Sequence, residues 1–287
     1  MTADFKIGAM VESFRAGLRG GLEAAAAVGA QGVQMYVTRG ETHFLKLRGP
    51  ALQDLKRMLG DNNLELSALC GDFGGHGFQV AEGNAQRIED SKRVVDLACE
   101  LGCRPITTHI GVVPPDPRHP RYTVLAKACS EMARYAADHG RTFAIETGPE
   151  TAATLRRFLD DIAIPAGLGV NFDPGNLVMV CRENIPAAVA LLGRDIVHTH
   201  AKDGTSLKPV DPEVFYGAVP RPPDFKGSEY LREMPLGQGQ VPYSAYLAAL
   251  RQAGFHGYLT IEREVGTNPR QDIADAVSFL KRIMAQA

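Results

Sequence analysis

The sequence predicts an α/β protein of the (β/α)8, or TIM, barrel class, with residues 1–287 forming a single domain. Short apolar runs alternate with longer segments of helical periodicity along the whole chain. Eight strand-then-helix units follow one another at roughly 30-residue spacing, which suits a barrel of ~250 residues. A doubly wound open sheet also alternates strands and helices. The eight units, and the absence of Gly-x-Gly-x-x-Gly after the first strand, disfavour that sheet.

The first four units can be placed from their apolar runs and their breakers. Their strands are expected at residues 5–10, 32–37, 64–70 and 105–110, and their helices at 17–28, 50–59, 84–101 and 122–139. The four alanines at 24–27 favour helix. Pro50 falls in a first helical turn, where its missing N–H costs little. The glycine-rich stretch 71–77 and the proline-rich stretch 114–117 are expected to be loops.

The last four units continue the same pattern. Their strands are expected at residues 142–146, 168–173, 196–200 and 257–262, and their helices at 152–159, 185–192, 243–253 and 271–284. The final helix carries Ile273, Val277, Leu280 and Met284 on one face, which predicts burial of that face.

A long excursion, residues 203–241, separates the seventh strand from its helix. It holds six prolines and no sustained period. Long ordered loops in compact domains are usually functional, so we expect a lid or a subunit contact there.

Composition limits the classes of function and location. A net charge of −2 and the scattered Lys and Arg residues disfavour a nucleic-acid partner and leave a homo-oligomer open. No run reaches the ~18 apolar residues of a membrane span, and the start of the chain lacks a signal-peptide layout, so we expect a cytoplasmic protein. The five cysteines form no CxxC pair. Cys99 and Cys103 could hold a metal, but buried thiols in a reducing compartment are favoured.

Four polar residues close four consecutive predicted strands: Glu146, Asp173, His200 and Glu262. The first two gaps are 27 residues each, and the third, of 62, includes the excursion. Strand ends of a barrel gather at one mouth, where three carboxylates would repel one another unless a cation balanced them. We therefore predict one divalent metal ion. Oxygen donors with one imidazole suit Mn²⁺ or Mg²⁺ and do not exclude Co²⁺ or Zn²⁺.

Each of these residues also has an ordinary structural interpretation. Asp173 before Pro-Gly could cap a helix, as could Glu146, and His200 could be a core histidine. Glu264 shares a face with Glu262, and Glu262 is preferred as the ligand because it ends the apolar run. His198 lies one step deeper than His200, so we favour a supporting role over ligation for it.

Several motifs, most of them in the second half of the chain, resemble the xylose isomerase-like TIM barrel family of sugar phosphate isomerases and epimerases. They are Ala-Ile-Glu146, Val-Asn-Phe-Asp173-Pro-Gly, His198-Thr-His200-Ala-Lys202-Asp203, Pro-Leu-Gly-Gln-Gly239 and Gly-Tyr-Leu-Thr-Ile-Glu262. The resemblance implies an isomerase or epimerase acting on a sugar, cyclitol or keto-sugar. Glu146 and Glu262 would be the catalytic pair, one removing the proton α to a carbonyl and the other returning a proton, with a metal-stabilised enediolate between the two steps.

The resemblance also suggests substrate contacts and exposes departures. We expect substrate contacts from His109, Asn176, Lys202, Asp203 and His198, although Lys202 and Asp203 could instead pair with each other. Ketohexose 3-epimerases of the family usually have histidine at the position of Asn176 and arginine at that of Ser206. This chain also has no tryptophan to pack against a sugar. These differences weigh against a ketohexose substrate.

Three alternatives to an isomerase or epimerase are kept. A lyase or glycoside-cleaving enzyme could use the same metal site. An abasic-site endonuclease is less favoured, because the chain has eight histidines in all and no basic stripe. A non-catalytic binding subunit is the third.

Overall fold

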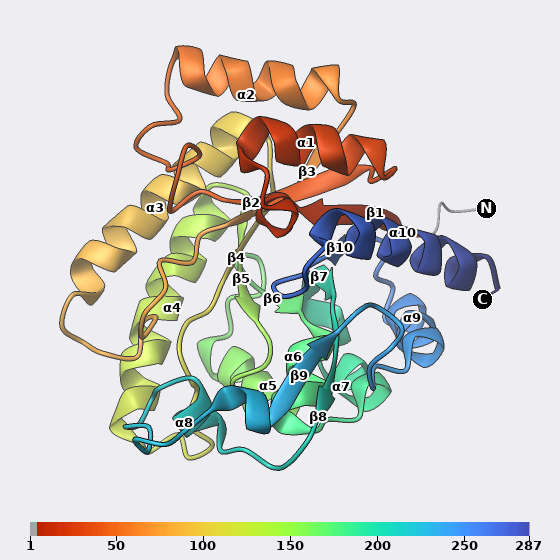
Figure 1. Ribbon diagram of the computed structural model, residues 1–287. Coiled ribbons are helices and arrows are strands. Elements are labelled where there is room, and N and C mark those ends of the chain that lie inside the picture. Colours follow the sequence, from red (N-terminus) through yellow and green to blue (C-terminus); the bar gives the residue numbers. More distant parts are fainter. Residues whose placement is uncertain (1–4, 287) are drawn as a thin grey trace.

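Eight parallel strands close into a barrel in the computed structural model, which describes residues 5–286 (Figure 1). Around the barrel the order is β1-β10-β7-β6-β5-β4-β3-β2. The strands are β1 (Lys6–Met10), β2 (Gly32–Tyr36), β3 (Glu65–Cys70), β4 (Pro105–Thr108), β5 (Thr142–Glu146), β6 (Leu168–Phe172), β7 (Ile196–Ala201) and β10 (Tyr258–Ile261). The predicted (β/α)8 barrel is confirmed.

Helices surround the barrel and bury one face each against it. They are α1 (Gly17–Ala27), α2 (Pro50–Asp61), α3 (Asn84–Leu101), α4 (Pro120–Asp138), α5 (Ala152–Ile162), α7 (Ile185–Leu192), α9 (Tyr243–Gln252) and α10 (Pro269–Gln286). Local chemistry begins several of them: the Thr151 side chain caps α5 and the Asn184 side chain caps α7. On α10, Ile273, Val277 and Leu280 are buried as predicted, whereas Met284 is only partly buried. Among the described residues, no helix combines the length and apolarity needed to cross a bilayer.

The register of the strands decides which polar residues meet at the mouth. Glu146 pairs with Asn171 between β5 and β6, and Asn171 pairs with His198 between β6 and β7. His200 pairs with Thr260 between β7 and β10. β4, β6 and β10 end just before His109, Asp173 and Glu262, so none of these three residues closes a strand. His109 and Glu262 begin loops, and Asp173 precedes a short helix.

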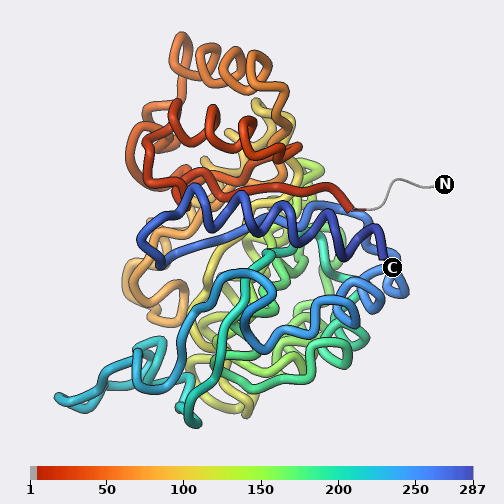
Figure 2. The backbone as a smooth tube through the Cα atoms, turned by 45° about the vertical axis from the view of Figure 1, so that its right-hand side comes forward, coloured from red at the N-terminus to blue at the C-terminus, as the bar shows by residue number. Residues whose placement is uncertain are grey.

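Two segments hold more regular structure than the sequence predicts. In the excursion, β8 (Asp203–Ser206) pairs antiparallel with β9 (Leu231–Met234), and a short helix, α8 (Pro212–Phe215), lies between them. After β6, the short helix α6 (Pro174–Asn176) continues into a π-helical turn, Leu177–Cys181. The part of the excursion drawn in cyan projects beyond the body of the barrel (Figure 2).

Candidate metal centre

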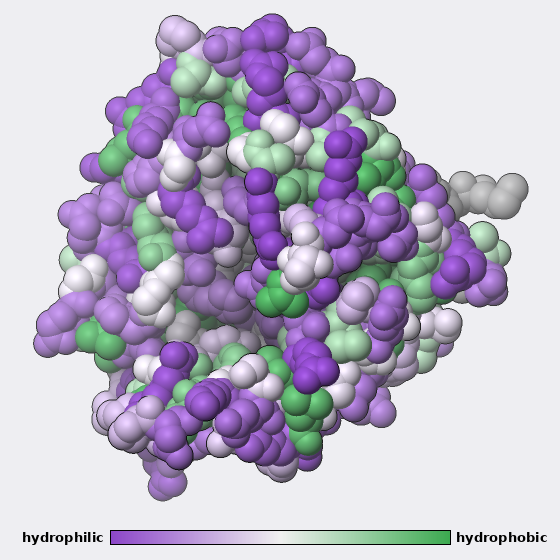
Figure 3. Space-filling model, viewed as in Figure 1, coloured by the Kyte–Doolittle hydropathy of each residue, from purple (hydrophilic) through white to green (hydrophobic). Residues whose placement is uncertain are grey.

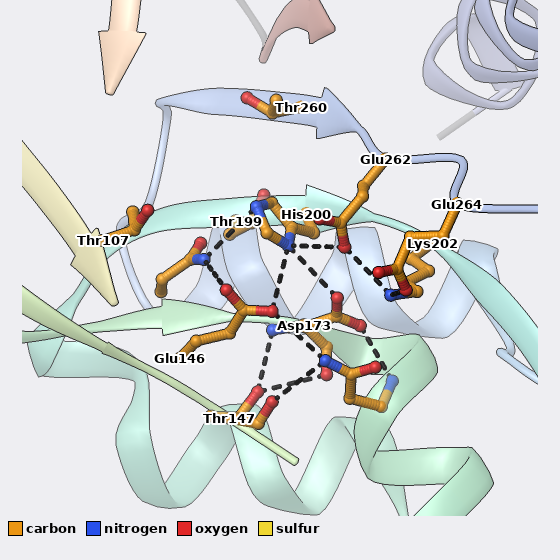
Figure 4. Close-up of polar contacts among 12 residues, drawn as sticks. Thr107, Glu146, Thr147, Asp173, Thr199, His200, Lys202, Thr260, Glu262 and Glu264 are labelled. Carbon is orange, nitrogen blue, oxygen red and sulfur yellow. Dashed lines mark hydrogen bonds and ion pairs between the residues drawn. The ribbon is translucent and has the colours of Figure 1, made fainter. Parts of the chain in front are cut away.

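Four side chains from four neighbouring strands converge at the carboxyl end of the barrel. Each of Glu146, Asp173, His200 and Glu262 offers one ligand atom, and these atoms all lie within 4.8 Å of one another. His200 is the centre of the group, and the carboxylates turn toward it (Figure 4). Its Nδ1 lies 3.1 Å from Asp173 Oδ2, 3.4 Å from Glu262 Oε2 and 3.6 Å from Glu146 Oε1. The convergence expected from the sequence is therefore present in the fold.

Asp173 serves two purposes at once. Its Oδ1 accepts a hydrogen bond of 2.8 Å from the backbone N–H of Asn176 and so caps α6. Its Oδ2 faces His200. The helix cap and the metal ligand, weighed as alternatives from the sequence, are thus compatible in one side chain.

The electrostatics of the four residues call for a positive charge among them. Burial alone would lower the pKa of His200, but Glu262, Glu146 and Asp173 raise it well above its usual value. Burial alone would raise the pKa of Glu146, but His109 and His200 hold it well below its usual value. Without a metal, a proton on His200 supplies the charge that the three carboxylates need. A divalent cation would supply more.

The donor set fits a divalent cation. His200 Nε2 lies 3.0 Å from Gln34 Oε1, so an Nε2–H donated to that oxygen leaves the Nδ1 lone pair facing the carboxylates. Three carboxylates and one imidazole without sulfur form a hard, mixed site. These residues could hold the ion, and the identity of the ion stays a prediction.

A second layer of polar side chains lies beneath the four, inside the barrel. Asn171 Nδ2 donates to Glu146 Oε2 at 3.2 Å, and Asn171 Oδ1 lies 2.8 Å from His198 Nδ1. The other ring nitrogen of His198 lies 2.9 Å from Thr260 Oγ1. Burial lowers the pKa of His198 well below its usual value, so its ring is neutral. His198 therefore orients Asn171 from below and does not line the cavity, which fits a supporting role and not the substrate contact also expected of it.

Sequence reasoning missed Gln34, Asn171 and Thr260. One signal could have found Asn171 and Thr260: they are polar residues two positions before Asp173 and Glu262, inside otherwise apolar strands. The two-residue period of a strand turns such residues to the same side as the ligands.

Burial and hydrogen-bond partners distinguish Glu262 from Glu264 as the candidate metal ligand. The side chain of Glu262 is 9% exposed and faces His200, whereas that of Glu264 is 62% exposed. Lys202 Nζ bridges them, 3.0 Å from Glu262 Oε2 and 2.5 Å from Glu264 Oε2. Lys202 thus pairs with these glutamates and not with Asp203, and Glu262 belongs to the candidate metal set.

His109 and Asn176 both contact Glu146, which lies across the site from Glu262. His109 Nε2 lies 3.4 Å from Glu146 Oε1, and Asn176 Nδ2 donates to the same oxygen at 3.2 Å. Burial opposes protonation of His109, but Glu146 raises its pKa to about 9. Both residues line the cavity above the four ligands, so their role as substrate contacts stays a prediction that this geometry permits.

The mouth holds a cavity of about 710 Å³, large enough for a small polar substrate. The centre of the face in Figure 3 is hollowed, and the surface around the hollow is largely hydrophilic. Glu146, Glu262 and Lys202 line the cavity from the barrel. Phe215 and Tyr216 line it from the excursion.

Asp203 lies at the base of the excursion, and its carboxylate binds backbone N–H groups of the same excursion. It accepts N–H groups from Gly204 (2.8 Å), Gly237 (2.9 Å), Gly239 (3.0 Å) and Val241 (3.0 Å). A Cβ on Gly239 would lie 2.2 Å from Asp203 Oδ1, so this position requires glycine. Asp203 does not line the cavity, so the expectation of a substrate contact does not fit its position.

Replacing Asp203 by alanine should loosen the excursion. Hydrogen bonds to a charged group contribute about 1.5–3 kcal/mol each and are not additive, so we expect a loss of about 3 kcal/mol in the free energy of unfolding. Urea unfolding measures this loss, and limited proteolysis should show new cleavage within 203–241. Asp224→Ala, at an exposed position of the same excursion, is the control and should change neither result. Unchanged protease resistance in the Asp203 variant would contradict the proposed anchor.

Glu150 is a buried carboxyl close to the mouth that sequence reasoning also missed. Its Oε2 accepts the N–H of Val113 at 3.3 Å, and its Oε1 has no hydrogen-bond partner within the described chain. Burial raises the pKa of Glu150 to about 8. The folded protein therefore keeps a proton on Glu150 at a pH where an unfolded glutamate, with a pKa of about 4.3, has lost it.

This difference makes stability depend on pH. The contribution of Glu150 is fully present below the unfolded pKa and falls as the pH rises toward about 8. Glu150→Gln removes the titration and keeps an acceptor for Val113. We expect it to raise the melting temperature at pH 8, relative to wild type, by a few degrees more than at pH 5. Glu82→Gln, at an exposed position, is the control, and an equal effect of Glu150→Gln at both pH values would rule out the titration.

The comparisons with known proteins agree with the fold. The sequence profile of the family described as "Xylose isomerase-like TIM barrel" matches residues 22–283, so the chain belongs to that family. No curated protein sequence matches the chain significantly. A xylose isomerase domain protein from Planctomyces limnophilus shares 28% identity, covers 100% of both chains and superposes with a TM-score of 0.78.

Two further solved structures resemble the chain in fold. A xylose isomerase-like TIM barrel protein from Mycobacterium smegmatis in complex with magnesium has 16% identity and a TM-score of 0.73, covering 100% of this chain and 99% of its own. A D-allulose 3-epimerase from Methylomonas sp. has 16% identity and a TM-score of 0.71, covering 98% and 97%. At this identity the likeness concerns the fold.

Proposed function

We propose that the protein is a divalent-metal-dependent isomerase or epimerase of a small sugar, cyclitol or keto-sugar. The observation that carries the proposal is the placement of Glu146 and Glu262: both line one cavity, and both belong to the candidate metal set with Asp173 and His200. The epimerase and the magnesium-bound protein of the same fold support it as analogies. Mn²⁺ is the preferred ion, with Mg²⁺, Co²⁺ and Zn²⁺ also compatible with the donors.

Each of the two proposed catalytic glutamates lies beside a cationic side chain. Glu146 is approached by His109 and Asn176, and Glu262 by Lys202. One glutamate would take the proton α to the substrate's carbonyl while the other returns a proton, which is general acid–base catalysis. When bound, the divalent cation would supply positive charge to the substrate's carbonyl and hydroxyl oxygens.

The departures noted in the sequence narrow the substrate. Asn176, where histidine is usual in the resembled epimerases, donates its amide to Glu146 instead of presenting an imidazole. Ser206, where arginine is usual, accepts a hydrogen bond of 2.9 Å from Arg182 Nε and does not line the cavity. These differences weigh against a ketohexose, so the proposal covers the reaction and does not single out that substrate class.

The test is metal-dependent hydrogen exchange. Apo-protein is loaded with Mn²⁺ and incubated in D₂O with a panel of ketoses, aldoses and ketocyclitols, and deuterium at the α-carbon is followed by NMR. We expect solvent deuterium in at least one substrate, lost on chelation of the metal, and a product that keeps the substrate's composition apart from the exchanged hydrogen. A product lighter by water would assign a lyase instead. Absence of exchange across the panel, or cleavage of an abasic duplex, would overturn the proposal.

A further inference from the structure

The excursion brings two aromatic side chains of the described residues to the mouth cavity, Phe215 and Tyr216, and Tyr216 is the one with a polar group. It follows α8 directly, and its ring centre lies 6.2 Å from that of His109, at a tilt of 43°. The excursion leaves the barrel after β7, whereas His109 follows β4. Tyr216 therefore reaches across the mouth to the side that carries Glu146.

The backbone on the far side makes room for the Tyr216 hydroxyl. Gly148 has a φ of +137°, and a Cβ there would lie 2.9 Å from the Tyr216 oxygen and 2.5 Å from the Cβ of Asn176. Any larger residue at 148 would displace the phenol and the amide that donates to Glu146. Gly148 thus lets the phenol and Asn176 lie side by side, next to a catalytic glutamate.

Contacts outside the cavity hold Tyr216 in place. The Arg121 guanidinium of α4 contacts the Glu213 carboxylate and the Ala218 carbonyl, on either side of Tyr216 along the chain. The Arg121 side chain is 10% exposed and that of Glu213 is 30% exposed, so this ion pair is partly withdrawn from solvent. Arg221 donates to the carbonyls of Val214 and Phe215. The segment that carries Tyr216 is therefore fixed without any bond from its own hydroxyl.

The hydroxyl itself is left free. No hydrogen bond to the Tyr216 oxygen occurs among the described residues, and the same holds for Tyr36, Tyr230 and Tyr246, whereas the hydroxyls of Tyr122, Tyr135, Tyr243 and Tyr258 each have a partner. Of the four hydroxyls without a partner, those of Tyr216, on the excursion, and Tyr36, at the end of β2, belong to residues that line the cavity. Burial raises the pKa of Tyr216 well above its usual value, so the phenol keeps its proton and can donate. A protonated phenol beside the reacting groups, and without a protein partner, is suited to bind a substrate oxygen.

We propose that Tyr216 determines substrate specificity: its hydroxyl binds a hydroxyl of the substrate beside Glu146, and its ring covers a C–H face of the substrate. The inference rests on the proposed function and deepens it. It requires a polyhydroxylated substrate with one apolar face. Phe215 and Met179, which also line the cavity, extend that apolar wall.

The kinetic test compares Tyr216→Phe, which removes only the hydroxyl, with Tyr216→Ala, which also removes the ring. The substrate is the compound that gives wild-type exchange in D₂O, together with its monodeoxy analogues. We expect Tyr216→Phe to raise KM about 3- to 10-fold with kcat within about twofold, the effect of one neutral hydrogen bond. Selectivity for the parent compound over one deoxy analogue should fall by the same factor, which a merely structural role would not produce. Tyr216→Ala should lower kcat/KM about 100-fold.

The matched control is Tyr230→Phe, a tyrosine of the same excursion that does not line the cavity. It should leave KM and the deoxy selectivity unchanged. Wild-type KM and selectivity in Tyr216→Phe would overturn the inference while leaving the proposed function standing. Equal losses in Tyr230→Phe would also overturn it, because they would assign the effect to the excursion as a whole.

A second measurement needs no substrate. In protein with ring-¹³C tyrosine, the Tyr216 signal is the one missing from Tyr216→Phe, and paramagnetic Mn²⁺ alone is the probe. One equivalent of Mn²⁺ should broaden the Tyr216 signal before that of Tyr258, which lies at the start of β10 at the other end of the barrel. Broadening of Tyr258 first would overturn the placement of Tyr216. If no tyrosine broadens and no exchange occurs, the proposed function fails, and the inference with it.

Discussion

Replacing Glu262 by glutamine is expected to lower the rate of metal-dependent deuterium exchange by about 10²–10⁴-fold. The change removes a carboxylate that can accept the α-proton and also removes one charge of the candidate metal set. Glutamine has nearly the same shape, and its oxygen can still accept from Lys202 Nζ, so the fold should persist. The rate is measured by NMR in D₂O at saturating Mn²⁺, and circular dichroism checks the fold.

The neighbouring Glu264 provides a matched control two residues away. It also pairs with Lys202, but its side chain is 62% exposed and lies outside the four-residue set. Glu264→Gln should therefore change the exchange rate by no more than about twofold. If Glu264→Gln abolished exchange and Glu262→Gln did not, the assignment of the two glutamates would be reversed.

The barrel and its site could be predicted from the sequence because both follow from local periodicity. Parallel strands of one barrel end at the same mouth, so polar residues at the ends of apolar runs meet there. For this reason the spacing of Glu146, Asp173 and His200 along the chain is enough to group them. Strand limits were less well defined: His109 and Glu262 begin loops. These errors in the strand limits did not change the predicted grouping, because loops at this edge of the barrel also face the mouth.

The excursion could not be predicted because its structure depends on contacts remote in sequence. β8, with the sequence Asp-Gly-Thr-Ser, has no apolar alternation and becomes a strand only by pairing with β9. Asp203 resembles a site residue because it follows Lys202, yet three of its four partners lie more than 30 residues away, in and just after a glycine-rich turn. Tyr216 reaches the mouth through the contact of Arg121 with Glu213, which no periodicity indicates.

Divalent metal should stabilise the fold strongly. Asp173 and His200 are fully buried, and Glu146 and Glu262 are nearly so, so a bound cation would replace repulsion among carboxylates by attraction. A ligand present at a thousand times its dissociation constant raises the free energy of unfolding by about 4 kcal/mol. For a chain of this size, we expect the melting temperature to rise on the order of 10 °C when Mn²⁺ is added to chelator-treated protein. Differential scanning calorimetry measures the shift.

The pH dependence and one variant make this prediction specific to the four residues. Because the carboxylates raise the pKa of His200 well above its usual value, metal must displace a proton from it, so the Mn²⁺-induced shift should be larger at pH 8 than at pH 6. Asp173→Asn keeps the cap on α6, because asparagine also caps helices, but removes one charged ligand. It should reduce the shift to less than about a third of that of the wild type. A shift of wild-type size in Asp173→Asn would mean that the ion binds elsewhere, because a site outside the four residues loses no ligand in this variant.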